Sequence, residues 1–184
     1  ITFDSFNDIK YPLKTKKSNK ILIDVGQSHL RKNISGAFAA YGKAFTNQDD
    51  VCLIAKIHQK PVKAAFDVDV NKILKEFKKQ YPKHAEIELI TEYVPNIIEL
   101  YNACDIVYTL SFCEGFYMPG LNSLSVGKLN VAPRYGGQLD FLNDENSLLV
   151  EGKLTRADVK EQYWTPNIQN THFESDLDDT AYKL

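Results

Sequence analysis

Residues 105–122, DIVYTLSFCEGFYMPGLN, decide the fold of this chain. The largely apolar residues 105–110 predict a buried strand, and a proline opens a predicted helix at 119–126. Such a connection places unpaired N–H groups of the helix at the end of the strand, where they can hold an anion. Gly115 lets a ligand approach the backbone, and the Glu114 carboxylate beside it could accept hydrogen bonds from hydroxyl groups. An ordinary strand-to-helix turn of an open α/β sheet has the same pattern, and both interpretations stay open at this point.

Short apolar runs alternate with helical patterns along most of the chain. We predict strands at 21–25, 51–57, 87–90, 106–110, 129–132 and 147–150, and helices at 34–45, 68–81, 96–104, 119–126 and 137–142. This alternation is typical of βαβ units. The predicted fold class is therefore α/β, a Rossmann-like doubly wound parallel sheet with strand order 3-2-1-4-5-6. Ligands of such sheets bind where the order reverses, between strands one and four.

The chain divides into three segments. Residues 1–20 are polar and rich in lysine, which predicts an interdomain linker or entry segment. Residues 21–153 form the α/β domain, and residues 154–184 form a C-terminal extension that we expect to be partly helical. Three elements are expected in this extension: a helix at 157–164, an acidic turn at 173–179 and a last helix that begins at 180–184.

The composition is that of a soluble domain with one core. The 184 residues are 43% hydrophobic and 25% charged, and the net charge of −2 gives no reason to expect binding to nucleic acid. No run is long enough for a transmembrane helix, and the start has no signal-peptide pattern. Cys52, Cys104 and Cys113 lack CxxC spacing, which favours reduced, mostly buried thiols in a cytoplasmic protein.

The loop after the first predicted strand, 26–33 (GQSHLRKN), is basic. It would face the same crevice as Glu114, where Arg31 or Lys32 could neutralise a diphosphate. The alternative is a solvated loop in which Asn33 caps the next helix. The loop matches neither the Walker A pattern nor GxGxxG, so no motif supports ATP or a nicotinamide cofactor.

Two further features could contribute to the crevice. The loop 133–138 (PRYGGQ) has paired glycines, which allow either close contact with a ligand or a tight turn. The four histidines show no metal-binding spacing, and no metal ligand is predicted. His29 and His58 follow predicted strands and could line the crevice, although surface or packing roles are the commoner outcome.

In their joint order, these segments resemble the C-terminal, nucleotide-sugar-binding half of the GT-B glycosyltransferases, specifically retaining family 4 (glycosyl transferases group 1). The resemblance covers about residues 21–153. After the first strand and its glycine, it is carried by 31–33 (RKN), 100–106 (LYNACDI), 111–119 (SFCEGFYMP, which looks like S-x-x-E-G-F-G-L-P), 125–132 (SVGKLNVA) and 135–137 (YGG).

The resemblance implies roles for individual residues. Glu114 would be the first glutamate of the family's EX7E motif, which holds hydroxyls of the transferred sugar. Asn122 stands where the second glutamate usually binds the ribose, and its amide can still form hydrogen bonds but carries no charge. In the first loop, Gln27 replaces the family's arginine, Lys32 matches its lysine, and Arg31 could supply the missing charge.

The implied catalytic residues are thus Glu114, Lys32 and Arg31. The implied residues for binding the sugar donor are Gly26, Gln27, Gly115, Phe116, Tyr117, Met118, Asn122 and His58. Backbone N–H groups of residues 115–118 would hold the diphosphate. No cofactor is implied beyond the donor substrate, a nucleoside diphosphate sugar such as a UDP- or GDP-sugar, and the chemistry would be metal-independent.

The implied function is transfer of a hexosyl group from this donor to an acceptor with retention of configuration, with Lys32 and Arg31 stabilising the leaving diphosphate. A separate N-terminal domain would bind a glycan, lipid or protein acceptor and could make the protein peripheral to a membrane. The fragment alone would be inactive. Gln27 and Asn122 favour an alternative, an inactive GT-B module with a binding or structural role. A nucleotide-sugar epimerase or dinucleotide enzyme on a related sheet is the other rival, and the missing glycine fingerprint argues against the dinucleotide version.

Overall fold

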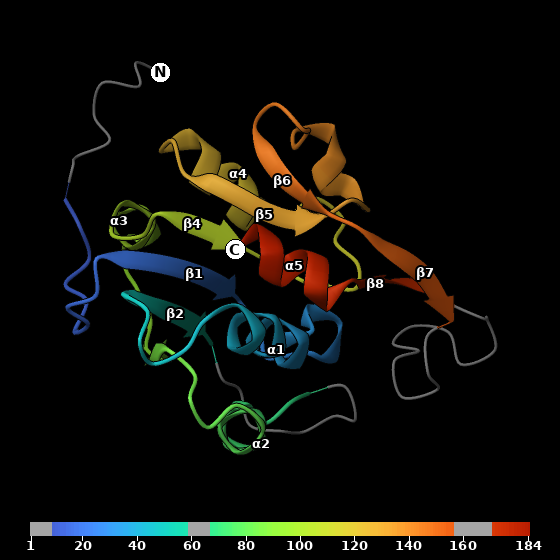
Figure 1. Cartoon of the computed structure of the whole chain (residues 1–184). Coiled ribbons are helices and arrows are strands. Elements are labelled where there is room, and N and C mark those ends of the chain that lie inside the picture. The colour runs from blue at the N-terminus through green and yellow to red at the C-terminus, as the bar shows by residue number, and fades with distance from the viewer. Residues whose placement is uncertain (1–8, 59–66, 157–170) are drawn as a thin grey trace.

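The computed structural model describes residues 9–58, 67–156 and 171–184. Its centre is a parallel sheet of six strands in the order β3-β2-β1-β4-β5-β6 (Figure 1). The strands are β1 (Asn19–Val25), β2 (Val51–Ile57), β3 (Glu86–Ile90), β4 (Ile106–Tyr108), β5 (Leu129–Pro133) and β6 (Ser147–Val150). The predicted fold class and strand order are confirmed.

Helices cover both faces of the sheet because alternate strand residues are apolar on both sides. Ile21 and Ile23 of β1 pack in the core beneath three helices: α1 (Ile34–Ala44), α2 (Val70–Gln80) and α5 (Leu177–Lys183). Leu22 points to the opposite face, which is covered by α3 (Ile97–Asn102) and α4 (Met118–Ser125). Two short 3-10 helices, η1 (Leu30–Lys32) and η2 (Gly137–Asp140), complete the connections, so the predicted helix at 137–142 is a single 3-10 turn.

Two tyrosines attach α1 to the sheet through hydrogen bonds inside the core. The Tyr108 hydroxyl donates to the Ala37 carbonyl oxygen at 2.5 Å, and the Tyr41 hydroxyl donates to the Glu86 carbonyl oxygen at 2.8 Å. Both rings are fully buried. These bonds satisfy groups that would otherwise be costly in an apolar interior, and they fix α1 over β1 and β2.

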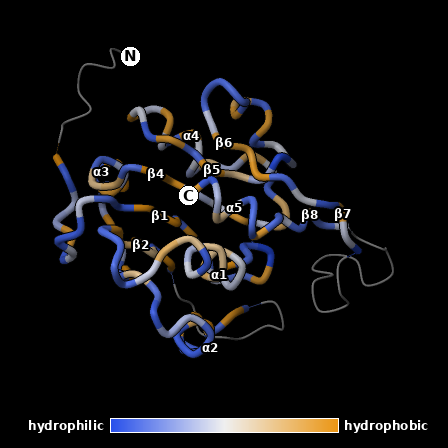
Figure 2. Tube along the Cα trace, in the orientation of Figure 1, coloured by the Kyte–Doolittle hydropathy of each residue, from blue (hydrophilic) through white to orange (hydrophobic). Residues whose placement is uncertain are grey.

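Hydropathy follows this layered arrangement. Figure 2 shows hydrophobic residues along β1 and β2 and mainly hydrophilic ones along α2, where only Val70 and Phe77 are buried. Among the described residues, none of the helices has the length and apolar character needed to cross a bilayer.

The polar segment before β1 is attached to the sheet edge. The Tyr11 backbone N–H donates to the Glu99 carbonyl oxygen, and the Glu88 carboxylate of β3 accepts from the backbone N–H groups of Lys14 and Thr15. Tyr11 and Leu13 also pack against the core on the α3 side. The segment therefore lies along β3 and α3.

The C-terminal part differs from expectation. A strand β7 (Gly152–Arg156) pairs with β8 (Thr171–Ser175) as an antiparallel hairpin, so the expected acidic turn at 173–179 is wrong. Asp176 follows β8 and caps α5, which begins at Leu177 instead of residue 180. All five residues of β7 lie outside the buried core, so the strand has no apolar alternation that would reveal it. The expected helix at 157–164 lies outside the described residues.

Candidate functional site

Two basic side chains and one carboxylate meet at the point where the strand order reverses. Lys32 Nζ donates a hydrogen bond to Glu114 Oε1, and Arg31 Nη1 lies 3.2 Å from Glu114 Oε2. The Glu114 side chain is only 8% exposed and that of Lys32 12%. The structure thus brings the three predicted catalytic residues together, with two positive charges against one negative charge.

The electrostatics keep Glu114 ionised. Burial opposes the charged form, but the charge and hydrogen bond of Lys32 outweigh it, together with Ser111 and Arg31. The net result is a Glu114 pKa below its usual range. A carboxylate that is charged at neutral pH can accept hydrogen bonds but cannot donate one.

Backbone contacts hold the basic loop in place. Asn33 adopts a left-handed conformation with φ 45°, and its side chain accepts a hydrogen bond from Gly36 N, so the predicted cap of α1 is confirmed. The Phe112 N–H donates to the Arg31 carbonyl oxygen at 2.8 Å, which joins the basic loop to the Glu114 loop. The positions of the two cations are therefore set by the start of α1 and by the loop they face.

The paired glycines support the Glu114 loop from behind. Gly137 N donates to the Glu114 carbonyl oxygen at 3.1 Å, and a Cβ added to Gly137 would lie 1.8 Å from the Gly115 carbonyl oxygen. The paired glycines therefore allow a close approach between the backbones of two loops of the protein. Arg134, in the same loop, points to Asp144 instead and forms a two-bonded ion pair with it.

The charged cluster lies in a cavity of about 580 Å³. Nine of the eleven predicted site residues line it: Glu114, Lys32, Arg31, Gly26, Gln27, Phe116, Tyr117, Met118 and Asn122. Gly115 belongs to the same loop, and a Cβ on either Gly115 or Gly26 would meet no atom within 4 Å. Because protein packing does not require these two glycines, open access for a ligand remains a reason for them.

The two histidines lie elsewhere. His58 is exposed at the end of β2, and it is not among the described residues that line this cavity. His29 caps η1 by accepting a hydrogen bond from Arg31 N, and it lines a neighbouring hollow of about 360 Å³. Burial and then Arg31 lower the His29 pKa. His29 therefore helps to hold the backbone of the basic loop at Arg31.

Sequence reasoning missed a second charged pair in the same cavity. Asp24 of β1 and Lys56 of β2 are neighbours in the sheet register, with Oδ1 and Nζ 3.4 Å apart. The Asp24 Oδ2 atom also accepts a hydrogen bond from the Tyr101 hydroxyl at 2.7 Å. The signal was present in the sequence, because each residue is the one charge near the end of an otherwise apolar strand, ILIDV or VCLIAKI.

Tyr117 departs from the pattern that the resemblance provides. It stands where S-x-x-E-G-F-G-L-P has its second glycine, and its φ of 65° is the left-handed conformation that favours glycine. Such a conformation costs about 1–2 kcal/mol for other residues. The ring is buried against Gly120, where an added Cβ would lie 2.4 Å from it. The Tyr117 hydroxyl has no hydrogen-bond partner among the described residues.

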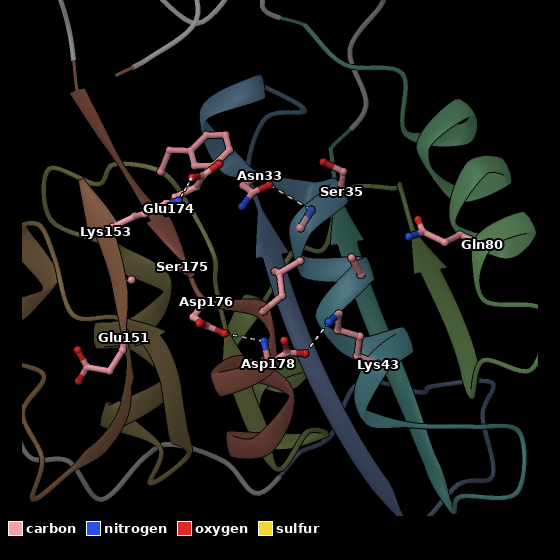
Figure 3. A pocket seen from close by; sticks show the side chains of 15 residues that line it. Asn33, Ser35, Lys43, Gln80, Glu151, Lys153, Glu174, Ser175, Asp176 and Asp178 are labelled. Atoms are coloured by element: carbon pink, nitrogen blue, oxygen red, sulfur yellow. Dashed lines mark hydrogen bonds and ion pairs between the residues drawn. The ribbon is translucent and has the colours of Figure 1, made fainter. Parts of the chain in front are cut away.

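A larger hollow of about 900 Å³ lies between α1, α5 and the β7–β8 hairpin (Figure 3). Its charged groups already have structural partners. Lys43 Nζ lies 2.5 Å from Asp178 Oδ1, and Asp176 caps α5 through the N–H groups of Asp178 and Asp179. The described part of the chain holds no cluster of three or more His, Cys, Asp or Glu residues suited to a metal ion. The smaller cleft around Glu114 is therefore the better candidate.

The free cysteines are arranged partly as expected. Cys52 and Cys104 are buried, whereas Cys113 is exposed beside Glu114. Burial raises the pKa of all three thiols, to about 11 for Cys52 and about 12 for Cys104. The neutral thiol is therefore favoured at each position.

A doubly wound sheet with a cationic cleft at its switch point defines a Rossmann-like domain, here with the architecture of the C-terminal half of a GT-B glycosyltransferase. The chain belongs to the glycosyl transferases group 1 family, whose model matches residues 5–162. No curated protein matches it.

Solved structures share the fold. The C-terminal domain of a glycosyl transferase group 1 family protein (LpcC) from Francisella tularensis is 22% identical, with a TM-score of 0.61 over 82% of this chain and 80% of that one. HepE from Anabaena, solved with UDP-glucose, is 18% identical, with a TM-score of 0.59 over 72% of this chain and 35% of HepE. Sucrose-phosphate synthase from Thermosynechococcus elongatus is 17% identical, with a TM-score of 0.66 over 95% of this chain and 39% of that protein. This chain thus spans well under half of the last two proteins.

Proposed function

We propose that this chain is the donor-binding domain of a retaining glycosyltransferase that transfers a hexosyl group from a nucleoside diphosphate sugar. One observation carries the proposal: two cations and one buried carboxylate share a cleft at the switch point of the sheet. An anionic diphosphate with a neutral sugar attached needs this combination, because phosphate oxygens require cations and sugar hydroxyls require acceptors.

In this proposal Glu114 binds hydroxyls of the transferred sugar, while Lys32 and Arg31 bind the diphosphate. The two cations would stabilise the charge that develops on the leaving diphosphate, without a metal ion. They are already placed by the start of α1 and by Phe112, so little reorganisation is needed when the substrate binds. The acceptor and its general base would belong to an N-terminal domain across the cleft.

Calorimetric titration of this chain with UDP, GDP and their glucose and mannose conjugates tests the proposal. We expect one nucleotide series to bind with a Kd between about 1 μM and 1 mM. Glu114→Gln should remove about a tenfold preference for the sugar conjugate over the free nucleotide, because a charge-assisted hydrogen bond is lost. Affinity for the free nucleotide should be kept or increased, since the two cations are released.

Lys79→Ala, a change at an exposed lysine of α2, is the matched control and should alter neither affinity. Absence of binding by every nucleotide would contradict a donor-binding role. Equal loss of nucleotide and conjugate binding in Glu114→Gln would contradict the role given to Glu114.

An inactive module of the same fold is the second candidate, favoured by Gln27 and Asn122 in the cleft. Both positions hold uncharged amides where the resemblance implies charged side chains. Incubating the protein in its natural full length with the nucleotide sugar that binds, and measuring release of the nucleotide, separates the two. Tight binding with no hydrolysis or transfer would favour the module.

A further inference from the structure

The end of the cleft formed by β1 and α3 has a chemistry of its own. Asp24 is an acidic residue in a buried strand, and its side chain is only 10% exposed. A carboxylate in such a place is costly unless it has partners, and Lys56 and Tyr101 supply them. Asp24 thus forms an ion pair with Lys56 and accepts a hydrogen bond from Tyr101. Asp24 and Lys56 nevertheless still line the open cavity.

We propose that the Asp24 carboxylate, held by Lys56 and Tyr101, binds the vicinal hydroxyls of the ribose of the nucleotide. This inference rests on the proposed function and extends it to a residue outside the motifs of the sequence. It places the charge for ribose binding on β1, whereas the resemblance implies a glutamate on α4 at the position of Asn122.

The hydrogen-bonding capacity of Asp24 supports this role. An ionised carboxylate has about four acceptor sites, and within the described residues two side-chain groups contact this one, at 2.7 Å and 3.4 Å. Burial and then the charge of Asp24 raise the pKa of Tyr101, so the tyrosine keeps its proton and donates it. Asp24 therefore remains an acceptor with free positions for two hydroxyl groups.

The charges of the residues that line the cleft indicate which part of the substrate lies beside Asp24. Lys32 and Arg31 form the cationic part, where a diphosphate would bind, with Glu114 beside it for the sugar. Phosphate oxygens would be repelled by Asp24, so this carboxylate suits a neutral group with hydroxyl donors. A nucleoside diphosphate sugar has two neutral groups with hydroxyl donors, the sugar and the ribose, and since Glu114 is assigned to the sugar, the ribose is the group for Asp24.

Asn122 belongs to the same wall. The Tyr101 hydroxyl, which donates to Asp24, is also close to the Asn122 side chain, so the amide and the carboxylate share this tyrosine as a neighbour. A glutamate at position 122 would bring a second negative charge to this hydroxyl while Asp24 is present. The asparagine and the aspartate therefore complement each other, and exchanging their charges gives a direct test.

The experiment compares binding of UDP and 2′,3′-dideoxy-UDP, or the guanine pair if GDP is the nucleotide that binds. We expect the unaltered chain to prefer the ribose form by about 10- to 100-fold, the range for hydrogen bonds to a charged group. Asp24→Asn should reduce this preference to about threefold or less, with affinity for the dideoxy form unchanged. The double variant Asp24→Asn with Asn122→Glu should restore it, whereas Asn122→Glu alone should weaken binding of both forms.

Lys79→Ala serves as the matched control, because this exposed lysine of α2 lies outside the cleft and its loss should keep the full ribose preference. Equal binding of the ribose and dideoxy forms by the unaltered chain would overturn the inference without any variant, even if Asp24→Asn failed to fold. A full preference retained in a folded Asp24→Asn variant would also overturn it. If no nucleotide bound at all, the proposed function would fail and this inference with it.

Discussion

Two clusters of three charged side chains, one around Glu114 and one around Arg134, differ in burial more than in bonding. Arg134 makes the better geometry, with two hydrogen bonds to Asp144, at 2.6 and 3.1 Å, and one to Glu151 at 2.8 Å. All three side chains are more than a third exposed. In the cleft, the Glu114 and Lys32 side chains are 8% and 12% exposed.

Under the proposed function, burial and position at the switch point distinguish the cleft cluster from the exposed one, whereas the number of good contacts does not. Exposed ion pairs are screened by water and salt and contribute little. A buried carboxylate carries a desolvation cost, and a cluster of like cations around it adds repulsion that a purely structural ion pair does not need. Lys32 and Arg31 converge on one carboxylate in a cavity, so an anionic ligand could take over part of that interaction.

The largest effect is expected for Lys32→Ala. Losing this charge should lower the kcat of glycosyl transfer by about 100- to 1000-fold, the usual loss when one preorganised group for a developing negative charge is removed. Steady-state kinetics of the full-length protein checks it, with Lys79→Ala as the control. A decrease of less than about fivefold would show that the buried cluster is structural, like the exposed one.

Several features of this comparison could be predicted from the sequence. The alternation of apolar runs with helical patterns was enough to predict the sheet and its strand order. The approach of Lys32 to Glu114 could then be predicted, because parallel strands place their carboxyl ends together. Asn33 was recognisable as a cap because its residue type suits that role. These are local patterns combined with one topological rule.

The features that were missed depend on contacts between distant segments. The pairing of Asp24 with Lys56 follows from the register of β1 against β2, which no local pattern fixes. The approach of Gly137 to Gly115 follows from the packing of two loops. The β7–β8 hairpin pairs residues at least 15 positions apart in the chain, and β7 has no apolar period to reveal it.

The second largest effect concerns the backbone support under Glu114. Gly137→Ala should destabilise the protein by about 3 kcal/mol, because the new Cβ would lie 1.8 Å from the Gly115 carbonyl oxygen. Gly115→Ala places its Cβ in open space, so stability should be unchanged while nucleotide affinity falls about tenfold. Denaturant unfolding and titration measure the pair. Equal stability of the two variants would mean that the loop adjusts without cost.

Two tyrosines beside the cleft allow a test of how much a hydrogen-bond partner matters for a buried hydroxyl. Tyr101→Phe removes a hydroxyl that donates to Asp24 and should cost about 2 kcal/mol of stability. Tyr117→Phe removes a buried hydroxyl without a partner among the described residues, so stability should be unchanged or increase by up to about 1 kcal/mol. Chemical denaturation of both variants tests this contrast. If Tyr117→Phe lost as much stability as Tyr101→Phe, the Tyr117 hydroxyl would have to have a hydrogen-bond partner in the ligand-free protein.

The pH dependence of stability should distinguish the buried cluster from the exposed one. The Glu114 pKa is lower in the folded chain than its ordinary value of 4.5, so the folded state binds a proton less readily than the unfolded state. Its stabilising contribution is therefore complete above pH 4.5 and is lost as the pH falls below that value. Thermal melts between pH 7 and pH 3 should show a shallower acid decline for Glu114→Gln. Parallel curves for the two proteins would contradict the electrostatic role of Lys32.

The smallest effect is expected for Arg134→Ala, although this change removes three hydrogen bonds with short donor–acceptor distances. The guanidinium and both carboxylates are exposed, so water replaces most of what the ion pairs supply. We expect the Tm of the variant to differ from that of the unaltered chain by less than about 2 °C. This difference should be smaller still in 0.5 M salt, where the Debye length is about 4 Å and the ion pairs are screened. Nucleotide affinity should be unchanged because Arg134 does not line the cleft. A loss comparable with that of Tyr101→Phe would show that bond geometry outweighs burial in this fold, and the contrast between the two clusters would fail.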